Sequence, residues 1–390
     1  ATRVDASQLI EKGRENLLKQ SNSFSTAPWT LTSNGTLTSG QSGYDGSNDA
    51  WKIEANTTAQ TYVNQVLLSS ISANTTTTFS VYAKSGNVDF LKILLVTAGS
   101  NSIITFDLTD GSNSSNLRTI SVNAENVGNG WYRCSITAAP GTNTNAVRIE
   151  VRSTASDAIA AAGSFIYIQD SQVELGLAAT EIIDTTTAPV SAGILENTPR
   201  FDYSGGATCP SLLLEPSRTN LVGQSEYLAG WNRFQNVTKS IDGSIVNPEG
   251  ALASKYTKNS TSTSIASFDF LTISASTKYT FSYFAKKGNY STTKIEVGAG
   301  ANNVQLQYNF DTDTLSGVSN GSQTLVDSSV QDYGNGWVRV IGVFTGTATS
   351  INLTIYLLSA VNDYIYLYGA QLEAGSYPTS YIPTYGVSQT

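Results

Sequence analysis

Histidine is absent from this chain of 390 residues, and its absence excludes several kinds of active site. Ser-His-Asp and Cys-His triads need an imidazole base, and His-ligated zinc needs an imidazole ligand. There are only two cysteines, Cys134 and Cys209, and they are too far apart for a C-x-x-C zinc or redox motif. Cys134 lies in an apolar strand pattern and Cys209 in a Gly-rich segment, so we expect two free thiols rather than a disulfide.

Charge is also scarce. Charged residues make up 13% of the chain, against about 25% in an ordinary soluble domain, and the net charge is −8. No basic stripe could neutralise phosphates, so nucleic acid is excluded as a partner, and anionic lipid is disfavoured for the same reason. No apolar run reaches the roughly 18–20 residues that a membrane span needs, which excludes membrane insertion.

The chain instead contains an internal duplication. Four motifs occur twice in the same order, roughly 200 residues apart, which is the spacing of a repeated domain. The matched pairs are Arg14-Glu15-Asn16-Leu17-Leu18 with Arg218-Thr219-Asn220-Leu221-Val222, Phe79-Ser80-Val81-Tyr82-Ala83-Lys84 with Phe281-Ser282-Tyr283-Phe284-Ala285-Lys286, Gly128-Asn129-Gly130-Trp131 with Gly334-Asn335-Gly336-Trp337, and Gln172-Val173-Glu174 with Gln371-Leu372-Glu373.

Each copy is predicted to be all-β. Lys278 to Ala285 and Ala146 to Val151 alternate with a period of two, and Asn-Gly, Asp-Gly and Gly-Asn turns separate such runs. We count about eight or nine strands per copy, which is typical of a β-sandwich. The only helix-compatible stretch, Ser156 to Gly163, is expected to be a loop.

The resulting architecture is two tandem jelly-roll β-sandwich domains, residues 12–180 and 212–384, joined by an ordered Pro-containing connector, residues 181–211. An N-terminal segment, residues 1–11, and a C-terminal tail, residues 385–390, complete the chain. Each sandwich holds a full complement of strands, so each is expected to fold alone. Four of the nine prolines lie in or beside the connector (Pro189, Pro199, Pro210 and Pro216), which favours order over a flexible tether.

The repeated motifs resemble jelly-roll modules of structural proteins of tailed bacteriophages, which look like carbohydrate-binding modules of the β-sandwich type. The closing Gly369-Ala370-Gln371-Leu372-Glu373-Ala374-Gly375 and the entry Leu212-Leu213-Leu214-Glu215-Pro216 contribute to the resemblance. In such proteins the opening Ala1 to Ala6 typically follows an upstream segment, so Ala1 is expected to be a cut point or a processed start.

This resemblance implies a non-enzymatic component of the virion surface: a tail fibre, a tail spike or a capsid decoration. Its partners would be other virion proteins, a second copy of itself, and a host-surface glycan. The alternative is the carbohydrate-binding part of a secreted bacterial polysaccharide-active protein.

Four aromatic residues are candidates for stacking on a glycan. Trp51 has no tryptophan partner in the second copy, and Tyr364, Tyr366 and Tyr368 occupy every second position of one strand. A binding face requires the tyrosine row to be exposed. In the alternative interpretation, which we favour, the three rings form the sandwich core while Ile365 and Leu367 pack against the connector.

Three carboxylates are candidates for a structural metal site. Glu174 and Glu373 occupy the same place in the last strand of each copy, where the resemblance implies a structural calcium ion. Asp170 could add a second carboxylate in the first copy only, because Gly369 stands there in the second. Calcium takes six to eight oxygen ligands, so these residues alone do not define a site, and turn formation is the simpler role for most other aspartates. We expect no catalytic residues and no enzyme activity.

Overall fold

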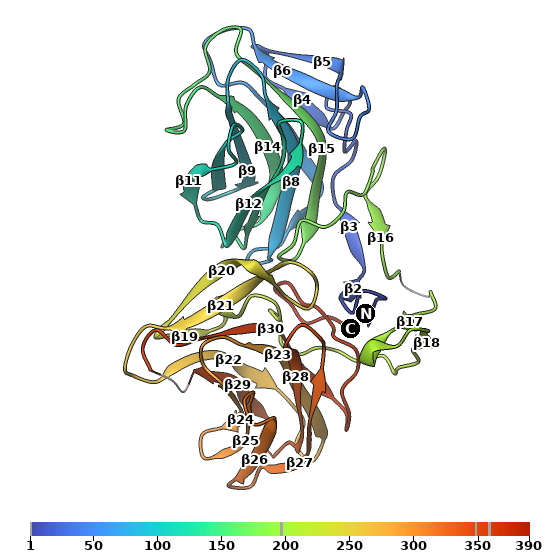
Figure 1. Cartoon of the computed structure of the whole chain (residues 1–390), viewed down its shortest axis with the longest axis vertical. Helices are drawn as coiled ribbons and strands as arrows, with labels where there is room; N and C mark the ends of the chain where they lie inside the picture. Colours follow the sequence, from blue (N-terminus) through green and yellow to red (C-terminus); the bar gives the residue numbers. More distant parts are fainter. Residues whose placement is uncertain (1, 196–197, 348, 358–359) are drawn as a thin grey trace. The chain divides into compact units, whose positions relative to one another are not determined.

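The computed structural model describes residues 2–195, 198–347, 349–357 and 360–390, and it divides the chain into two compact units. The first unit, Arg14–Ala192, is called the first sandwich. The second unit combines Ala1–Gly13 with Gly193–Thr390 and contains the second sandwich. Each unit contains two six-stranded antiparallel sheets, so the prediction of an all-β chain with two tandem sandwiches is confirmed (Figure 1). Ala1 itself lies outside the described residues.

The two sheets of the first sandwich are formed from β4 to β15, and the chain passes repeatedly from one sheet to the other. One sheet has the order β11 (Asn113–Leu117), β10 (Ser102–Asp107), β9 (Phe90–Thr97), β14 (Thr144–Arg152), β7 (Tyr62–Ile71), β4 (Trp29–Leu31). The other has the order β12 (Ser121–Gly128), β13 (Trp131–Ala138), β8 (Thr77–Ser85), β15 (Phe165–Leu175), β6 (Ala50–Ala55), β5 (Gly35–Gln41).

The second sandwich repeats this arrangement with β19 to β30. One sheet has the order β19 (Arg233–Gln235), β22 (Ser264–Thr272), β29 (Ser350–Leu357), β24 (Thr292–Ala299), β25 (Asn302–Asn309), β26 (Thr314–Asn320). The other has the order β20 (Val237–Val246), β21 (Leu252–Lys258), β30 (Tyr364–Ala374), β23 (Lys278–Lys287), β28 (Trp337–Thr345), β27 (Thr324–Asp332).

Each sandwich therefore has twelve strands in the described residues, more than the eight or nine expected from the sequence. The additional strands are edge strands such as β5, β12 and β27, whose residues are mostly exposed or half-buried. These strands contain few apolar residues, so their sequences show no clear alternation of apolar and polar residues. They nevertheless pair with their neighbours through backbone hydrogen bonds.

An inner core fills the space between the sheets of each sandwich. In the first it includes Phe79, Ile93 and Val173, and in the second it includes Phe281, Ile295 and Leu372, all fully buried. Matched residues of the duplicated motifs thus occupy matched core positions. Cys134 belongs to the first core, and Cys209 is exposed; both are free thiols.

The repeated Gly-Asn-Gly motif forms a tight turn in each copy. Gly128, Asn129 and Gly130 all have positive φ angles, and so do Gly334, Asn335 and Gly336. Glycine and asparagine adopt this left-handed conformation at little cost, which explains the motif. The turn leads into Trp131 and Trp337, which are buried in smaller aromatic clusters outside the inner cores.

Within the part of the chain that the structure describes, three two-stranded sheets complete the fold. In the first unit, β3 (Arg14–Asn16) pairs with β16 (Val190–Ala192); in the second unit, β1 (Thr2–Val4) pairs with β2 (Ile10–Lys12), and β17 (Phe201–Asp202) with β18 (Ser211–Leu212). Two short 3₁₀ turns, η1 (Ser204–Gly206) and η2 (Leu228–Gly230), also lie in the second unit. None of the helices in the described part of the chain has the length and hydropathy to cross a membrane.

Candidate functional site

Trp51 is half-buried and packs on the inner core of the first sandwich. Its indole Nε1 donates a hydrogen bond of 2.8 Å to the backbone oxygen of Asn22, and its ring meets Phe24 edge-on at 6.5 Å. These contacts hold the ring in a packing role and leave only part of it accessible. The role of Trp51 in stacking on a glycan therefore stays a prediction.

The tyrosine row of β30 is not exposed as a binding face would require. Tyr366 and Tyr368 are 5% and 2% exposed, and only Tyr364 is half-buried. Moreover, Ile365 and Leu367 lie in the inner core of the sandwich, whereas Tyr366 and Tyr368 lie on the opposite face of the sheet. The interpretation that the tyrosine rings are buried is therefore right for Tyr366 and Tyr368, but the placement of the rings in the sandwich core is wrong. They lie on the outer face of the sheet, and Ile365 and Leu367 are the core residues.

A second aromatic cluster covers this outer side of β30. It contains Ile10, Phe284, Trp337, Tyr366, Tyr368 and Tyr381. Ile10 comes from the N-terminal hairpin and Tyr381 from the exit segment, the name used here for residues 376–386 after the last strand. The strand is apolar on both faces because both faces are covered.

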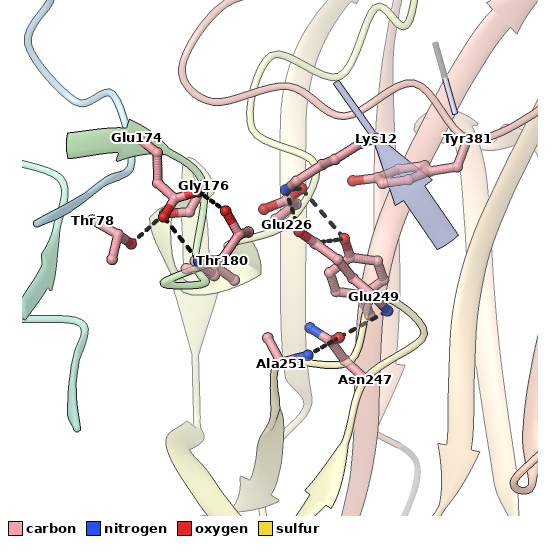
Figure 2. A network of polar contacts seen from close by, with 12 residues as sticks. Lys12, Thr78, Glu174, Gly176, Thr180, Glu226, Asn247, Glu249, Ala251 and Tyr381 are labelled. Atoms are coloured by element: carbon pink, nitrogen blue, oxygen red, sulfur yellow. Dashed lines mark hydrogen bonds and ion pairs between the residues drawn. The ribbon is translucent and has the colours of Figure 1, made fainter. Parts of the chain in front are cut away.

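Glu174 and Glu373 are buried and accept hydrogen bonds from protein donors in the same pattern (Figure 2 for Glu174). Glu174 Oε1 accepts from Thr180 N at 2.9 Å and Gln172 Nε2 at 2.8 Å, and Oε2 accepts from Thr180 Oγ1 at 2.6 Å. Glu373 has the same bonds, from Thr379 and Gln371. Both oxygens of each carboxylate are thus engaged in tying the chain after the last strand to the sandwich.

Two further matched pairs, Asn16 with Asn220 and Arg133 with Arg339, also bind the segment that follows the last strand. Asn16 and Asn220 each donate to two backbone oxygens, one on the last strand and one on the segment after it, and each accepts two backbone N–H bonds. Arg133 and Arg339 donate to the backbone oxygens of Thr180 and Thr379. The duplicated Asn, Arg and Gln-x-Glu motifs are therefore a structural device that closes each sandwich.

Asp170 and Glu174 have no hydrogen-bond partner in common among the described residues. Asp170 Oδ2 accepts a hydrogen bond of 3.0 Å from Tyr44 Oη. The pKa of Asp170 is raised to about 6, chiefly by burial and also by the neighbouring Asp184, Asp49 and Asp45, against the lowering effect of the Tyr44 bond. Among the described residues no three His, Cys, Asp or Glu side chains are grouped to hold a metal ion, and the calcium assignment stays a prediction.

A buried ion cluster in the second unit was not foreseen. Lys12 Nζ lies 3.0 Å from Glu226 Oε1 and 2.6 Å from Glu249 Oε1, and all three side chains are nearly inaccessible (Figure 2). Tyr368 Oη donates to Glu249 Oε2 at 2.6 Å. The cluster fixes the N-terminal segment to the second sandwich, since Lys12 belongs to β2 and Glu226 follows the motif that opens the second copy.

The electrostatics of this cluster favour a proton on one carboxyl. The pKa of Glu226 is raised to about 7, chiefly by burial; Glu249 adds to the rise, and Lys12 opposes it. Burial opposes the charge of Lys12, but the two glutamates outweigh it and hold the Lys12 pKa well above its ordinary value. Within the described residues, Glu226 Oε2 has no hydrogen-bond partner, as expected for a crowded pair of carboxylates around one ammonium.

The second sandwich also carries an open polar surface, the outer face of the sheet running from β19 to β26. The register places one row of side chains straight across six strands: Gln235, Ile265, Tyr356, Lys294, Gln307 and Ser316. The next row is Arg233, Ser267, Thr354, Glu296, Gln305 and Val318. We call these rows the open face.

Most side chains of the open face are exposed or half-buried, whereas Ile265, Ser267 and Thr354 are buried. Lys294 lies over the half-buried Tyr356 ring at 5.1 Å, and Gln305 Nε2 donates to Glu296 Oε2 at 2.8 Å. Burial and the nearby Glu296 carboxylate raise the pKa of Tyr356, so its hydroxyl remains protonated at neutral pH. The face thus offers hydroxyl, amide, ammonium and carboxylate groups around one aromatic ring.

The corresponding face of the first sandwich is closed. Its row contains Tyr62, Glu150, Lys92, Thr105 and Ser114, of which Glu150, Lys92 and Thr105 are buried. The loop 153–164 lies over them: Asp157 binds Lys92 Nζ at 2.7 Å and Arg152 Nε at 2.8 Å, and Ser114 Oγ donates to the backbone oxygen of Ala155.

Loop length distinguishes the two sandwiches. The segment between β14 and β15 spans residues 153–164, whereas its counterpart between β29 and β30 spans only residues 358–363. The sequence comparison of the two copies gave no indication that this loop covers a sheet face. The sequence feature that could have indicated the difference is the shorter spacing between the last two strands of the second copy, together with the matched lysines Lys92 and Lys294.

Comparisons with known proteins identify no family. No family model and no curated protein matches the chain. Among solved structures, a tandem pair of CBM22 domains of Paenibacillus barcinonensis Xyn10C is 12% identical, covering 93% of this chain and 98% of that one, with a TM-score of 0.30. The mycobacterial arabinofuranosyltransferase AftD is 10% identical over 93% and 37%, with a TM-score of 0.23. At these values the likeness carries no conclusion about ligand or activity.

Proposed function

We propose that this chain is a non-enzymatic structural protein of a bacteriophage virion, a tail fibre or spike segment or a capsid decoration, that binds a host-surface glycan through the open face of its second sandwich. The observation that carries the glycan-binding part is the pair of polar rows across six strands with Tyr356 near their centre. The virion assignment is supported by the resemblance of the duplicated motifs to phage modules.

The chemistry of the open face suits a polyhydroxyl ligand. Sugar hydroxyls both donate and accept hydrogen bonds, and the face supplies acceptors on Glu296 together with donors on Lys294 and both kinds of group on Gln305. The Tyr356 ring offers an apolar surface to sugar C–H groups while its hydroxyl remains a donor. The first sandwich, whose matching row is covered, is expected not to bind.

Asp269, which pairs with Arg233 of the second row, is suited to holding a ligand rather than to cleaving it. Glycosidic cleavage needs one carboxylic acid with a raised pKa to protonate the leaving group. Burial favours the neutral form of Asp269, but the ion pair with Arg233 at 2.6 Å and the Ser267 hydroxyl outweigh it, so its pKa is lowered. Asp269 therefore remains ionised and cannot act as that acid.

A glycan array followed by calorimetry on the positive glycan tests the proposal. Tyr356→Ala is expected to weaken binding at least tenfold, about 1.4 kcal/mol, without changing the melting temperature of the chain. Tyr62→Ala is the matched control, because Tyr62 stands in the same row beside Glu150 on the closed face. Equal affinity of Tyr356→Ala and the parent would refute the assignment of the open face.

The alternative, a carbohydrate-binding part of a secreted bacterial polysaccharide-active protein, predicts a different location. Electron microscopy of virions labelled with antibody to this chain separates the two. Labelled tails or capsids support the virion proposal. The chain's absence from purified particles and its presence in bacterial culture medium would favour the alternative.

A further inference from the structure

A cavity of about 520 Å³ lies inside the second unit, away from the open face. Four pieces of chain surround it: the β1–β2 hairpin, residues 202–215 with the β17–β18 hairpin, the strands β27 and β28, and the exit segment. This volume lies within the range of roughly 300–1,000 Å³ that is common for small-molecule sites. Both hairpins that cover the cavity precede the second copy's opening motif and lie outside the duplicated blocks.

The cavity has an apolar floor with one aromatic wall. Val4, Ile10 and Tyr381 contribute apolar surface, and all three are buried. Tyr333 is half-buried at the side, with its ring packed edge-on against Phe284 at a centroid distance of 4.8 Å. A fixed aromatic ring bordering a cavity is a suitable surface for the C–H groups of a sugar ring.

Polar groups of both kinds stand at the rim. Gln331 and Asp332 are exposed next to Tyr333, and Arg3 and Asp202 lie on the hairpin and connector side. Arg3 Nη2 is paired with Glu11 Oε2 at 2.6 Å, so its charge is balanced. With donors and acceptors present and charges of both signs at the rim, the site suits a neutral polyhydroxyl ligand better than an ionic one.

The segments that border the cavity, namely the β1–β2 hairpin, the connector and the exit segment, are held together by hydrogen bonds in the absence of a ligand. Arg200 Nη1 donates to the backbone oxygen of Thr2 at 3.0 Å and to Ser380 Oγ at 2.9 Å, which links connector, hairpin and exit segment. Thr2 Oγ1 donates to the backbone oxygen of Tyr381 at 2.6 Å. Lys12, buried between Glu226 and Glu249, anchors the hairpin itself. A preformed site loses less conformational entropy on binding.

We propose that this cavity is a second carbohydrate site, one that takes the end of a neutral saccharide, a single sugar ring or a disaccharide. The cavity is open to solvent on one side, so the end of a saccharide chain can enter it, whereas the open face suits an extended chain. The site is independent of the open face, so a glycan can bind here even if the open face binds none.

Saturation-transfer NMR on the full chain tests the cavity, with glucose, galactose, N-acetylglucosamine, cellobiose and lactose as probes. In the parent protein we expect transfer from at least one of these sugars. Tyr333→Ala is expected to reduce the transfer at least fivefold. Because removing Tyr333 also loosens its packing on Phe284, the exposed Gln331→Ala is the second variant, expected to lower the signal with an unchanged melting temperature.

Tyr62→Ala, on the closed face of the first sandwich, is the matched control and should leave the transfer unchanged. Loss of transfer in Tyr356→Ala with full transfer in Tyr333→Ala and Gln331→Ala would overturn the cavity site while supporting the open face. Absence of transfer from every probe to the parent would also overturn it. Loss in the cavity variants alone supports it, whatever the outcome for the open face.

Discussion

Glu174 and Glu373 make the same three hydrogen bonds in the two sandwiches, each to a threonine six positions later and a glutamine two positions earlier. This identity explains why the duplicated motif has kept a buried carboxylate in a strand. Among the described residues, the segment after the last strand has no neighbouring strand at this point. The carboxylate accepts the hydrogen bond of its backbone N–H, which would otherwise be buried and unpaired.

Chelation should not destabilise the protein. Because both oxygens of Glu174 and Glu373 accept bonds from protein donors, we expect the melting temperature to be equal with EDTA and with added calcium. Glu373→Ala should lower the stability of the second sandwich by ~1–3 kcal/mol for each donor left unsatisfied. Differential scanning calorimetry measures both. A drop in melting temperature on chelation would restore the calcium hypothesis.

Tyr366→Ala should destabilise the second unit strongly. Tyr366 is 5% exposed, its ring belongs to the outer aromatic cluster, and its hydroxyl donates to Asp242 Oδ2 at 2.7 Å. We expect a loss of about 3–5 kcal/mol, as for other large-to-small changes at buried aromatic positions. Denaturant unfolding measures it. Tyr366→Phe, which keeps the packing, is the control, and an unchanged midpoint for Tyr366→Ala would contradict the structure.

The hydroxyl of Tyr366 also controls a nearby carboxylate. It is the main cause that holds the pKa of Asp242 at about 2, and the Ser244 backbone and side chain add to it. In Tyr366→Phe the pKa of Asp242 should return toward its ordinary range. A ¹³C NMR titration of the labelled carboxyl follows this change, and a pKa still near 2 would show that the Ser244 bonds suffice.

The second unit should lose stability as the pH rises through neutrality. Glu226 has a folded pKa of about 7, raised by burial, whereas the unfolded chain has the ordinary value near 4.5. Between these values the folded state binds more protons, so the contribution is complete below about pH 4.5 and is lost as the pH rises past 7. Tyr368, Tyr381 and Tyr385, which face the cluster, have raised pKa values and stay neutral throughout.

Glu226→Gln isolates this effect. The variant keeps the shape of the side chain and cannot ionise, so its unfolding midpoint should vary less than the parent's between pH 5 and pH 8. Denaturant unfolding at several pH values compares the two. Parallel pH profiles for parent and variant would show that another group governs the dependence.

Only one thiol should react in the folded protein. Cys209 is exposed, whereas Cys134 is buried and burial raises its pKa, which suppresses the thiolate. A thiol reagent should therefore label one cysteine per chain under native conditions and both after denaturation. Intact mass analysis counts the adducts, and peptide mapping that placed the native adduct on Cys134 would disagree with the structure.

The sequence was informative where residues repeat or alternate. Period two along Lys278 to Ala285 and the Gly-Asn-Gly motif led directly to strands and turns that the structure contains. The Gln-x-Glu motif was found as a matched pair, but its partner threonines follow in an irregular segment without periodicity. From the sequence alone, a single glutamate that binds a metal ion cannot be distinguished from one that accepts hydrogen bonds from a neighbouring segment.

Sites built from distant residues could not be anticipated. Lys12, Glu226 and Glu249 come from three separate segments, and no local pattern links them. The rows of the open face depend on the register of six strands, which pairing alone determines. For the Tyr364 strand, alternation correctly implied two apolar faces, but it could not tell which face met the inner core.

The attachment of Lys12 to Glu226 has a consequence for how the chain is made. The two residues are 214 positions apart. At a synthesis rate of 5–20 residues per second, the N-terminal hairpin leaves the ribosome roughly 10–40 seconds before its partner glutamate exists. During that interval the first sandwich can fold, while the hairpin must wait with Ile10 and the Lys12 side chain uncovered. The residues of this hairpin are therefore synthesised well before the glutamate that fixes them in place.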